Sequence, residues 1–281
     1  MRSMLPERFR HLRAQEVFRL LGPQLPRYVA LLPQWLLFRM MNRNLLGNSS
    51  THEPEGAEVQ EILKRKEQVV QGLLLEHKGG RFLEIGIGEF PVLPRLKLII
   101  ANGISYTGCD FQAVCESHAL QMKVACIDVS RITFAGNSVG TYAWTLFEML
   151  ERGERYDCIY LDGHHTFYVD LPALELAHLL LRPGGQIMVD DIQWTLSLLK
   201  RNMARRFTTW CFYRDMYDFS SYTRGQAVEP HLKRIVQKLL VDEYRYEREN
   251  ELSSEWWWVL RKPMLDGSES KHVRFTDRAP T

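Results

Sequence analysis

From residue 81 to residue 191 the chain alternates short apolar segments with segments of helical periodicity. Parallel strands need a crossover connection between them, and that connection is commonly a helix. The alternation therefore predicts a parallel sheet covered by helices on both faces. The expected strands are 81–88, 105–111, 131–138, 156–163 and 186–191, and the expected helices between them are 92–103, 113–125, 141–153 and 171–185.

Further elements are expected on both sides of this region. A helix over about 58–76 would end before Gly79-Gly80, and another is expected near 193–204. Segments 235–249 and 255–262 resemble two strands that could form an antiparallel pair at the sheet edge. The predicted fold class is α/β: a doubly wound, Rossmann-like, mostly parallel sheet with an antiparallel C-terminal strand pair and an N-terminal helical extension.

Length and composition are those of a soluble globular chain. With 281 residues there is room for one large domain or for one domain with an extension. We expect an N-terminal extension over 1–50, a main domain over 58–262 and a disordered tail over 263–281. A net charge of +2 and the lack of a basic stripe in the main domain predict no nucleic-acid partner.

The first 43 residues hold eight arginines, no lysine and two acids. Apolar residues recur at helical spacing from Phe9 to Leu21, and Pro26 and Pro33 are expected to interrupt the segment after that helix. Three roles stay open for this region: a helical cap on the main domain or on a second subunit, a helix on a membrane surface, or a mitochondrial presequence. No segment is suited to crossing a bilayer.

Five scattered cysteines without a CxxC pair favour reduced thiols and a cytoplasmic protein. Aromatic residues are frequent between Trp210 and Tyr222. They are typical of core or subunit packing, and they could also form a wall over a substrate pocket. We further expect a homo-oligomer.

Three successive predicted strands end in groups that could bind a nucleotide. Glu84, Gly86 and Gly88 end the first, Asp110 ends the second, and Asn137-Ser138 follow the third. Ligands of open α/β sheets bind at these strand ends, where an acid can accept hydrogen bonds from ribose hydroxyls. Asp110 and Ser138 could also be ordinary cap or turn residues.

Three carboxylates end the next two strands: Asp162 after one, and Asp190 and Asp191 after the other. Neighbouring strands lie ~5 Å apart, so these oxygens could hold Mg²⁺ or Mn²⁺. They could also serve as helix caps. His165, three residues beyond Asp162, is the best candidate for a general base, with a structural role as the alternative.

These motifs come in an order that resembles a known family. FLEIGIG, GCDF, GNS, YDCIYLDGHH and RPGGQIMVDD follow one another as in class I S-adenosylmethionine-dependent methyltransferases. Within that superfamily the chain is most similar to the metal-dependent O-methyltransferases of catechols and of natural-product sugars. The resemblance covers roughly residues 58–200, and its most specific part is the spacing of DGxH, PGG and DD.

The resemblance implies a Mg²⁺-assisted O-methyltransferase whose acceptor is a hydroxyl of a small molecule, of a sugar or natural-product-like kind. The resemblance also implies a role for each site residue. S-adenosylmethionine would be bound by Glu84, Gly86, Gly88, Asp110, Asn137, Ser138 and Asp162. The metal would be held by Asp162, Asp190 and Asp191, and the base would be His165. Two other functions stay open, a methyltransferase acting on RNA or protein and a non-catalytic assembly module with the same fold.

Overall fold

The structure is a computed structural model that describes residues 25–42, 57–88, 91–138, 141–214 and 216–264. Its chain forms two compact units. Unit 1 comprises residues 1–55 and 194–230, and unit 2 comprises residues 56–193 and 231–281. Residues 194–230 are thus grouped with the N-terminal extension. The helix expected over 9–21 and most of the expected tail lie outside the described residues.

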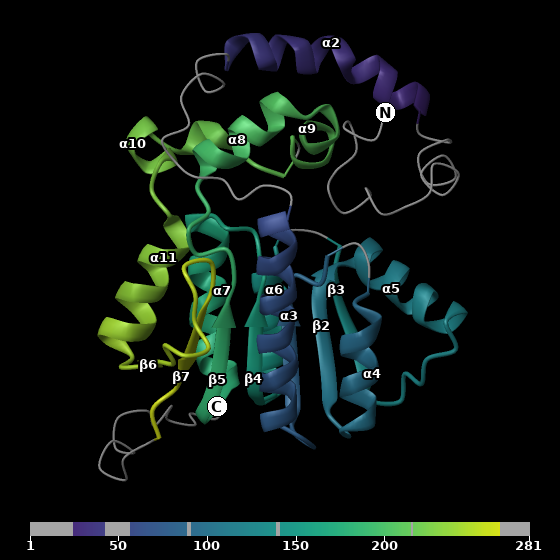
Figure 1. Ribbon diagram of the computed structural model, residues 1–281, viewed down its shortest axis with the longest axis vertical. Helices are drawn as coiled ribbons and strands as arrows, with labels where there is room; N and C mark the ends of the chain where they lie inside the picture. The colour runs from purple at the N-terminus through teal and green to yellow at the C-terminus, as the bar shows by residue number, and fades with distance from the viewer. Residues whose placement is uncertain (1–24, 43–56, 89–90, 139–140, 215, 265–281) are drawn as a thin grey trace, which may run out of the picture. The chain divides into compact units, whose positions relative to one another are not determined.

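Unit 2 contains one seven-stranded sheet in the order β3-β2-β1-β4-β5-β7-β6 (Figure 1). Its first five strands are parallel, β7 is antiparallel to β5, and β6 is antiparallel to β7. This confirms the predicted fold class. The strands are β1 Arg81–Ile85, β2 Ser105–Phe111, β3 Ile132–Asn137, β4 Tyr156–Leu161, β5 Leu181–Val189, β6 Glu247–Arg248 and β7 Trp258–Arg261.

Helices cover both faces of the sheet, and each face has its own apolar core (Figure 1). Strand residues alternate between the two cores, so Phe82 lies in one and Leu83 in the other. Trp257 and Trp258 also lie in different cores. The helices are α3 Ala57–Glu76, α4 Leu93–Ala101, α5 Gln112–Val124, α6 Tyr142–Glu151, α7 Phe167–Leu180 and α11 His231–Ile235.

The strand predicted over 235–249 is wrong for most of its length. Residues 231–235 form α11, the π-helical segment η6 runs over Val236–Glu243, and only Glu247–Arg248 are extended. Val236 and Leu240 are buried in the same core at a spacing of four residues, which is a helical period that a short apolar run hides. The helix expected over 171–185 instead begins at Phe167, and Leu181 already starts β5.

The described residues of unit 1 form helices around an aromatic cluster. Trp35 of α2 packs edge-on against Phe207 and donates its indole N–H to the carbonyl oxygen of Met203 at 2.9 Å. The expected break at Pro26 and Pro33 is wrong, because α2 is continuous and contains Pro33. The elements are α2 Leu25–Met41, α8 Leu196–Arg205, α9 Phe207–Tyr213, η5 Phe219–Ser221 and α10 Arg224–Ala227. Among the described residues, no helix is long and apolar enough to cross a membrane.

Candidate active site

Backbone hydrogen bonds hold the carboxyl ends of the central strands of unit 2 side by side. The N–H of Gly86 donates to the carbonyl oxygen of Cys109 at 2.8 Å, and the N–H of Asp162 donates to that of Ile85 at 2.9 Å. The N–H of Asp190 continues the series to Leu161 at 2.9 Å. The segments that follow β1, β2, β4 and β5 therefore emerge at one edge of the sheet, as the sequence predicts.

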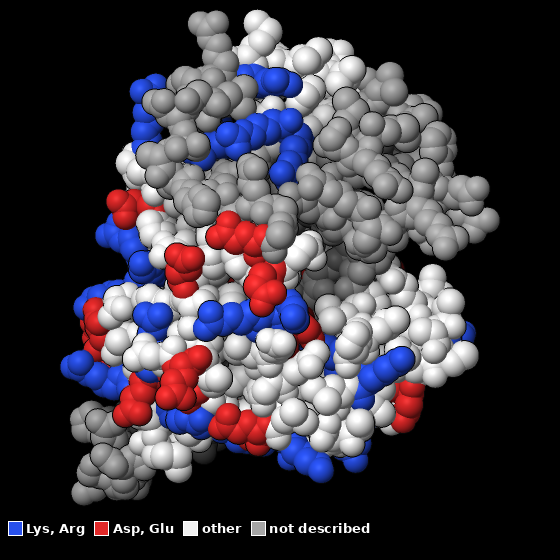
Figure 2. Space-filling view, viewed as in Figure 1, with Lys and Arg blue, Asp and Glu red and all other residues white. Residues whose placement is uncertain are grey.

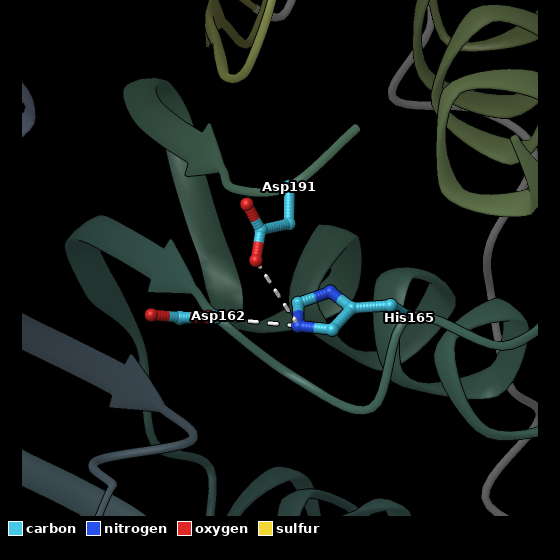
Figure 3. Close-up of side chains that lie close together, drawn as sticks. All are labelled: Asp162, His165 and Asp191. Atoms are coloured by element: carbon cyan, nitrogen blue, oxygen red, sulfur yellow. Dashed lines mark ion pairs between the residues drawn. The ribbon is translucent and has the colours of Figure 1, made fainter. Parts of the chain in front are cut away.

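Three side chains converge at this edge to form what we call the His–Asp cluster: Asp162, His165 and Asp191 (Figure 3). The Nε2 atom of His165 lies 3.7 Å from Asp162 Oδ1 and 3.7 Å from Asp191 Oδ2. One ligand atom from each residue falls within 4.8 Å of the others. Two carboxylate oxygens and an imidazole nitrogen so placed could hold a divalent cation.

Two members of the cluster have backbone angles that L-residues seldom adopt. The φ angle is 61° at His165 and 49° at Asp191. Such left-handed conformations cost energy and persist where the surrounding structure enforces them, which is often at functional sites. The loops after β4 and β5 therefore hold these side chains in place at the expense of backbone strain.

Asp190 is not one of the three residues of the His–Asp cluster, although the sequence groups it with Asp162 and Asp191 as a metal ligand. Its side chain is 1% exposed and accepts a hydrogen bond from the ammonium group of Lys66. The hydroxyl of Tyr160 donates to the same Asp190 oxygen, Oδ2, at 2.8 Å. The structure thus places His165, rather than Asp190, with the other two acids.

Lys66 and Tyr160 contribute to this region, although the sequence analysis gives neither of them a role. Lys66 Nζ also lies 3.7 Å from Asp162 Oδ2, and the Tyr160 hydroxyl lies 3.2 Å from that oxygen. Tyr160 could have been found, because it precedes Asp162 by two residues and shares its side of the strand. Lys66 belongs to α3, far from the acids in sequence, and no spacing connects it to them.

The charges of this region are unevenly compensated. Burial opposes the charge of Lys66, but Asp190, Asp162 and Asp191 together outweigh it and raise the pKa of the ammonium group. Burial and the other carboxylates raise the pKa of Asp162 to about 7, against the attraction of Lys66. Burial and Asp190 raise the pKa of Asp191, whereas Lys66 keeps the pKa of Asp190 low despite burial. Three carboxylates thus share one ammonium group.

A buried carboxylate fixes the loop that carries His165. Asp170 of α7 is fully buried and accepts hydrogen bonds from the N–H of Thr166 at 2.6 Å and the N–H of His164 at 3.2 Å. The hydroxyl of Tyr142 donates to the same carboxylate. His164 turns to Thr166, with 2.8 Å between its Nδ1 and the threonine Oγ1. These contacts set the direction of the loop on both sides of His165.

The glycine-containing turn after β1 is tied to the end of β2. Gly86 and Gly88 have φ angles of 85° and 69°, which glycine adopts without steric cost. The Asp110 carboxylate accepts hydrogen bonds from the N–H groups of Ile87 at 2.9 Å and Gly88 at 3.3 Å. A ring nitrogen of His118 lies 2.9 Å from the carbonyl oxygen of Gly88. Asp110 therefore holds the turn.

The other predicted nucleotide ligands lie in different surroundings. Glu84 is buried, and its carboxylate accepts hydrogen bonds from the Arg95 guanidinium and, at 2.8 Å, from the Tyr106 hydroxyl. Asn137 is buried at the end of β3, whereas Ser138 is exposed beyond it. Glu84 and Asn137 lie toward the same edge of the sheet as the glycine-containing turn after β1. The Glu84 carboxylate, however, already accepts hydrogen bonds from two side chains.

Comparisons with known proteins found similarity only among solved structures, since no family model and no curated protein matches the chain. An O-methyltransferase from Bacillus cereus in complex with SAH is 14% identical, with 82% of this chain and 99% of that one covered and a TM-score of 0.43. TomG of Streptomyces achromogenes, an O-methyltransferase of tomaymycin synthesis in complex with SAM, is 14% identical at a TM-score of 0.42, with 77% and 94% covered.

The MycE methyltransferase of the mycinamycin biosynthetic pathway, in complex with Mg and SAH, is also 14% identical. Its similarity covers 75% of this chain and 51% of that one at a TM-score of 0.43. At such identities and TM-scores, these similarities leave the function to be inferred from the residues of the chain itself.

Proposed function

We propose that the chain is an S-adenosylmethionine-dependent methyltransferase that transfers a methyl group to a hydroxyl of a small molecule with the help of a divalent cation. One observation carries the proposal: the convergence of Asp162, His165 and Asp191 at the carboxyl edge of a doubly wound sheet. Ligands of open α/β sheets bind at that edge, and the glycine turn after β1 opens there too.

The chemistry of the donors fits a hard cation such as Mg²⁺. Asp162 and Asp191 offer carboxylate oxygens that are about a third exposed, and Lys66 is the one ammonium group that the three acids of the region share. A divalent cation would favour the ionised form of both carboxylates. When bound, such a cation lowers the pKa of an acceptor hydroxyl and orients its oxygen.

S-adenosylmethionine would lie along the edge from β4 to β3. We propose that Gly86 and Gly88 let the backbone approach its amino-acid part, and that Asp110 accepts hydrogen bonds from the ribose hydroxyls. Glu84 would act mainly by holding Arg95 and the end of β1, with Asn137 and Ser138 next to the adenine. The family resemblance of the motifs supports these assignments.

His165 is proposed as the general base that removes the hydroxyl proton. S-adenosylmethionine, when bound, would supply the methyl group to the deprotonated acceptor oxygen, and the electron pair of the broken bond would stay on the sulfur of S-adenosylhomocysteine. A neutral imidazole is suited to accepting that proton near neutral pH. Its position between Asp162 and Asp191 also permits a second role, as a metal ligand, which metal titration of a His165 variant distinguishes.

Two binding measurements test the proposal without knowledge of the acceptor. Calorimetry should show S-adenosylhomocysteine binding that Asp110→Ala weakens by about 1–3 kcal/mol. Electron paramagnetic resonance should show Mn²⁺ binding that Asp162→Asn and Asp191→Asn each abolish. The control is Asp128→Asn, because Asp128 is an acid in the loop before β3, away from the His–Asp cluster.

Transfer of a labelled methyl group to a panel of small hydroxyl compounds would complete the test. Cofactor binding without any Mn²⁺ binding would contradict the metal assignment. Absence of both would point to an assembly module that retains only the fold.

A further inference from the structure

Charge is divided unequally between the two units of the chain. Unit 1 carries 14 Lys and Arg against 7 Asp and Glu, a net charge of +7. Unit 2 carries 22 against 27, a net charge of −5. The net charge of +2 for the whole chain is therefore the sum of a strongly basic unit 1 and an acidic unit 2. In the view of Figure 2, the described charged side chains around α2 and α8 are predominantly blue.

Helix α2 of this basic unit is apolar on two sides. One side places Leu31, Trp35 and Phe38 in the aromatic cluster with α8 and α9. The opposite side, which we call the α2 outer face, is exposed and consists of Leu32, Leu36, Leu37, Met40 and Met41. Their exposed fractions range from 41% to 74%. A row of large apolar side chains of this kind marks an interaction site more often than a solvated surface.

Charge and side-chain chemistry together select the partner. The outer face offers aliphatic and thioether groups, and the helix holds Arg27 and Arg39 but no acid. A second copy would bring two units of +7 against each other, which opposes association through this face. Single-stranded nucleic acid stacks on aromatic rings, whereas Trp35 and Phe38 are packed inside the unit.

We infer that the α2 outer face docks on the surface of an anionic phospholipid bilayer. Its leucine and methionine side chains would enter the boundary between headgroups and acyl chains, and the arginine-rich unit would be attracted by the negative headgroups. The helix would lie in the plane of the bilayer, since no described helix is suited to crossing it. This inference is independent of the proposed catalytic function.

Vesicle flotation of the full chain tests the inference. We expect binding to vesicles of phosphatidylglycerol and phosphatidylcholine, little binding to phosphatidylcholine alone, and release at high salt. The triple variant Leu37→Ser, Met40→Ser, Met41→Ser should bind on the order of tenfold more weakly or worse. Its fold should persist, because all three side chains point to solvent, and circular dichroism checks this.

The matched control carries Leu120→Ser and Val124→Ser, two exposed apolar residues on α5 of unit 2. This variant should bind vesicles as the parent does, and the single variant Met40→Glu should reproduce the loss seen in the triple variant. Equal binding to neutral vesicles, or binding that the α2 substitutions leave unchanged, would overturn the inference. Absence of vesicle binding would overturn it as well. A self-association of the chain that the triple variant abolishes would also overturn it, because the α2 outer face would then join two copies.

Discussion

At the scale of single residues, the two adjacent histidines of the DGHH motif have different surroundings. His165 points at Asp162 and Asp191, whereas His164 hydrogen-bonds to Thr166 within its own loop. A general base must lie within reach of the proton that it removes. The structure therefore favours His165 over its neighbour for a chemical role.

His165→Ala is expected to lower turnover by roughly 10²–10⁴-fold, because a positioned base contributes about that much. Cofactor affinity should change little. The rate of methyl transfer to an accepted hydroxyl compound measures the loss. His164→Ala is the control and should lower turnover much less than His165→Ala does. A damaging His164→Ala beside a silent His165→Ala would transfer the role to His164.

Lys66→Met should destabilise the protein by about 3–5 kcal/mol, because it leaves the buried Asp190 carboxylate without its cation. Urea unfolding measures the loss. Adding Asp190→Asn to the variant should restore part of the stability, since it removes the uncompensated charge. If the single variant were as stable as the parent, Lys66 would not be the partner on which Asp190 depends.

At the scale of elements, the loop between β4 and α7 depends on one carboxylate. Asp170→Asn replaces an oxygen that accepts the N–H of Thr166 and should loosen the path of the chain around His165. Because residues that orient ligands affect metal affinity, Mn²⁺ binding should weaken roughly 10–100-fold while cofactor binding is kept. Tyr142→Phe removes a single donor to the same carboxylate and should have a smaller effect.

Between β1 and α4, Gly86 and Gly88 make a matched pair. A Cβ atom at Gly86 would collide with the carbonyl oxygen of Asp162, whereas a Cβ atom at Gly88 would point into open space. Gly88→Ala should therefore lower the free energy of unfolding by about 1–2 kcal/mol, because alanine is strained in the left-handed conformation. Gly86→Ala should lower it by clearly more, because the collision is added to that strain. Urea unfolding of both variants tests this ranking, and a larger loss for Gly88→Ala would contradict the packing of β1 against β4.

At the scale of the whole molecule, acid should weaken the fold through His178. Burial, helped by the charge of Lys262, lowers the pKa of this histidine from 6.5 to about 4, and its ring stacks on Tyr244 at 3.8 Å. Since the folded state favours the neutral ring, the contribution of His178 to the free energy of unfolding is fully present above pH 6.5. It is lost as the pH falls toward 4.

Solvent reaches part of His178 and reduces the effect of burial on its pKa. We therefore expect the free energy of unfolding to fall by only about 1–2 kcal/mol. Chemical unfolding at a series of pH values measures it. His178→Phe keeps an aromatic ring on Tyr244 and should show a flatter profile between pH 6.5 and 4. An unchanged profile would assign the acid sensitivity to other groups.

The parallel sheet and the order of its elements could be predicted from the amino-acid sequence alone, because strand burial and helix periodicity are local patterns that recur along residues 81–191. The same reasoning located Asp110, Asp162, His165 and Asp191 near strand ends, since parallel strands all finish at one edge. The subunit arrangement, the cytoplasmic location and the roles of the site residues stay predictions. The strand expected over 235–249 failed because a short apolar run does not reveal its period.

Which charges meet could be learned only from the folded chain. Asp190 and Asp191 are adjacent in sequence, yet one is buried against Lys66 and the other joins His165 and Asp162. Lys66 reaches Asp190 across 124 positions of the chain, and residues 194–230 join the N-terminal segment in one basic unit. Such pairings depend on distances in space, which no local pattern of side chains records.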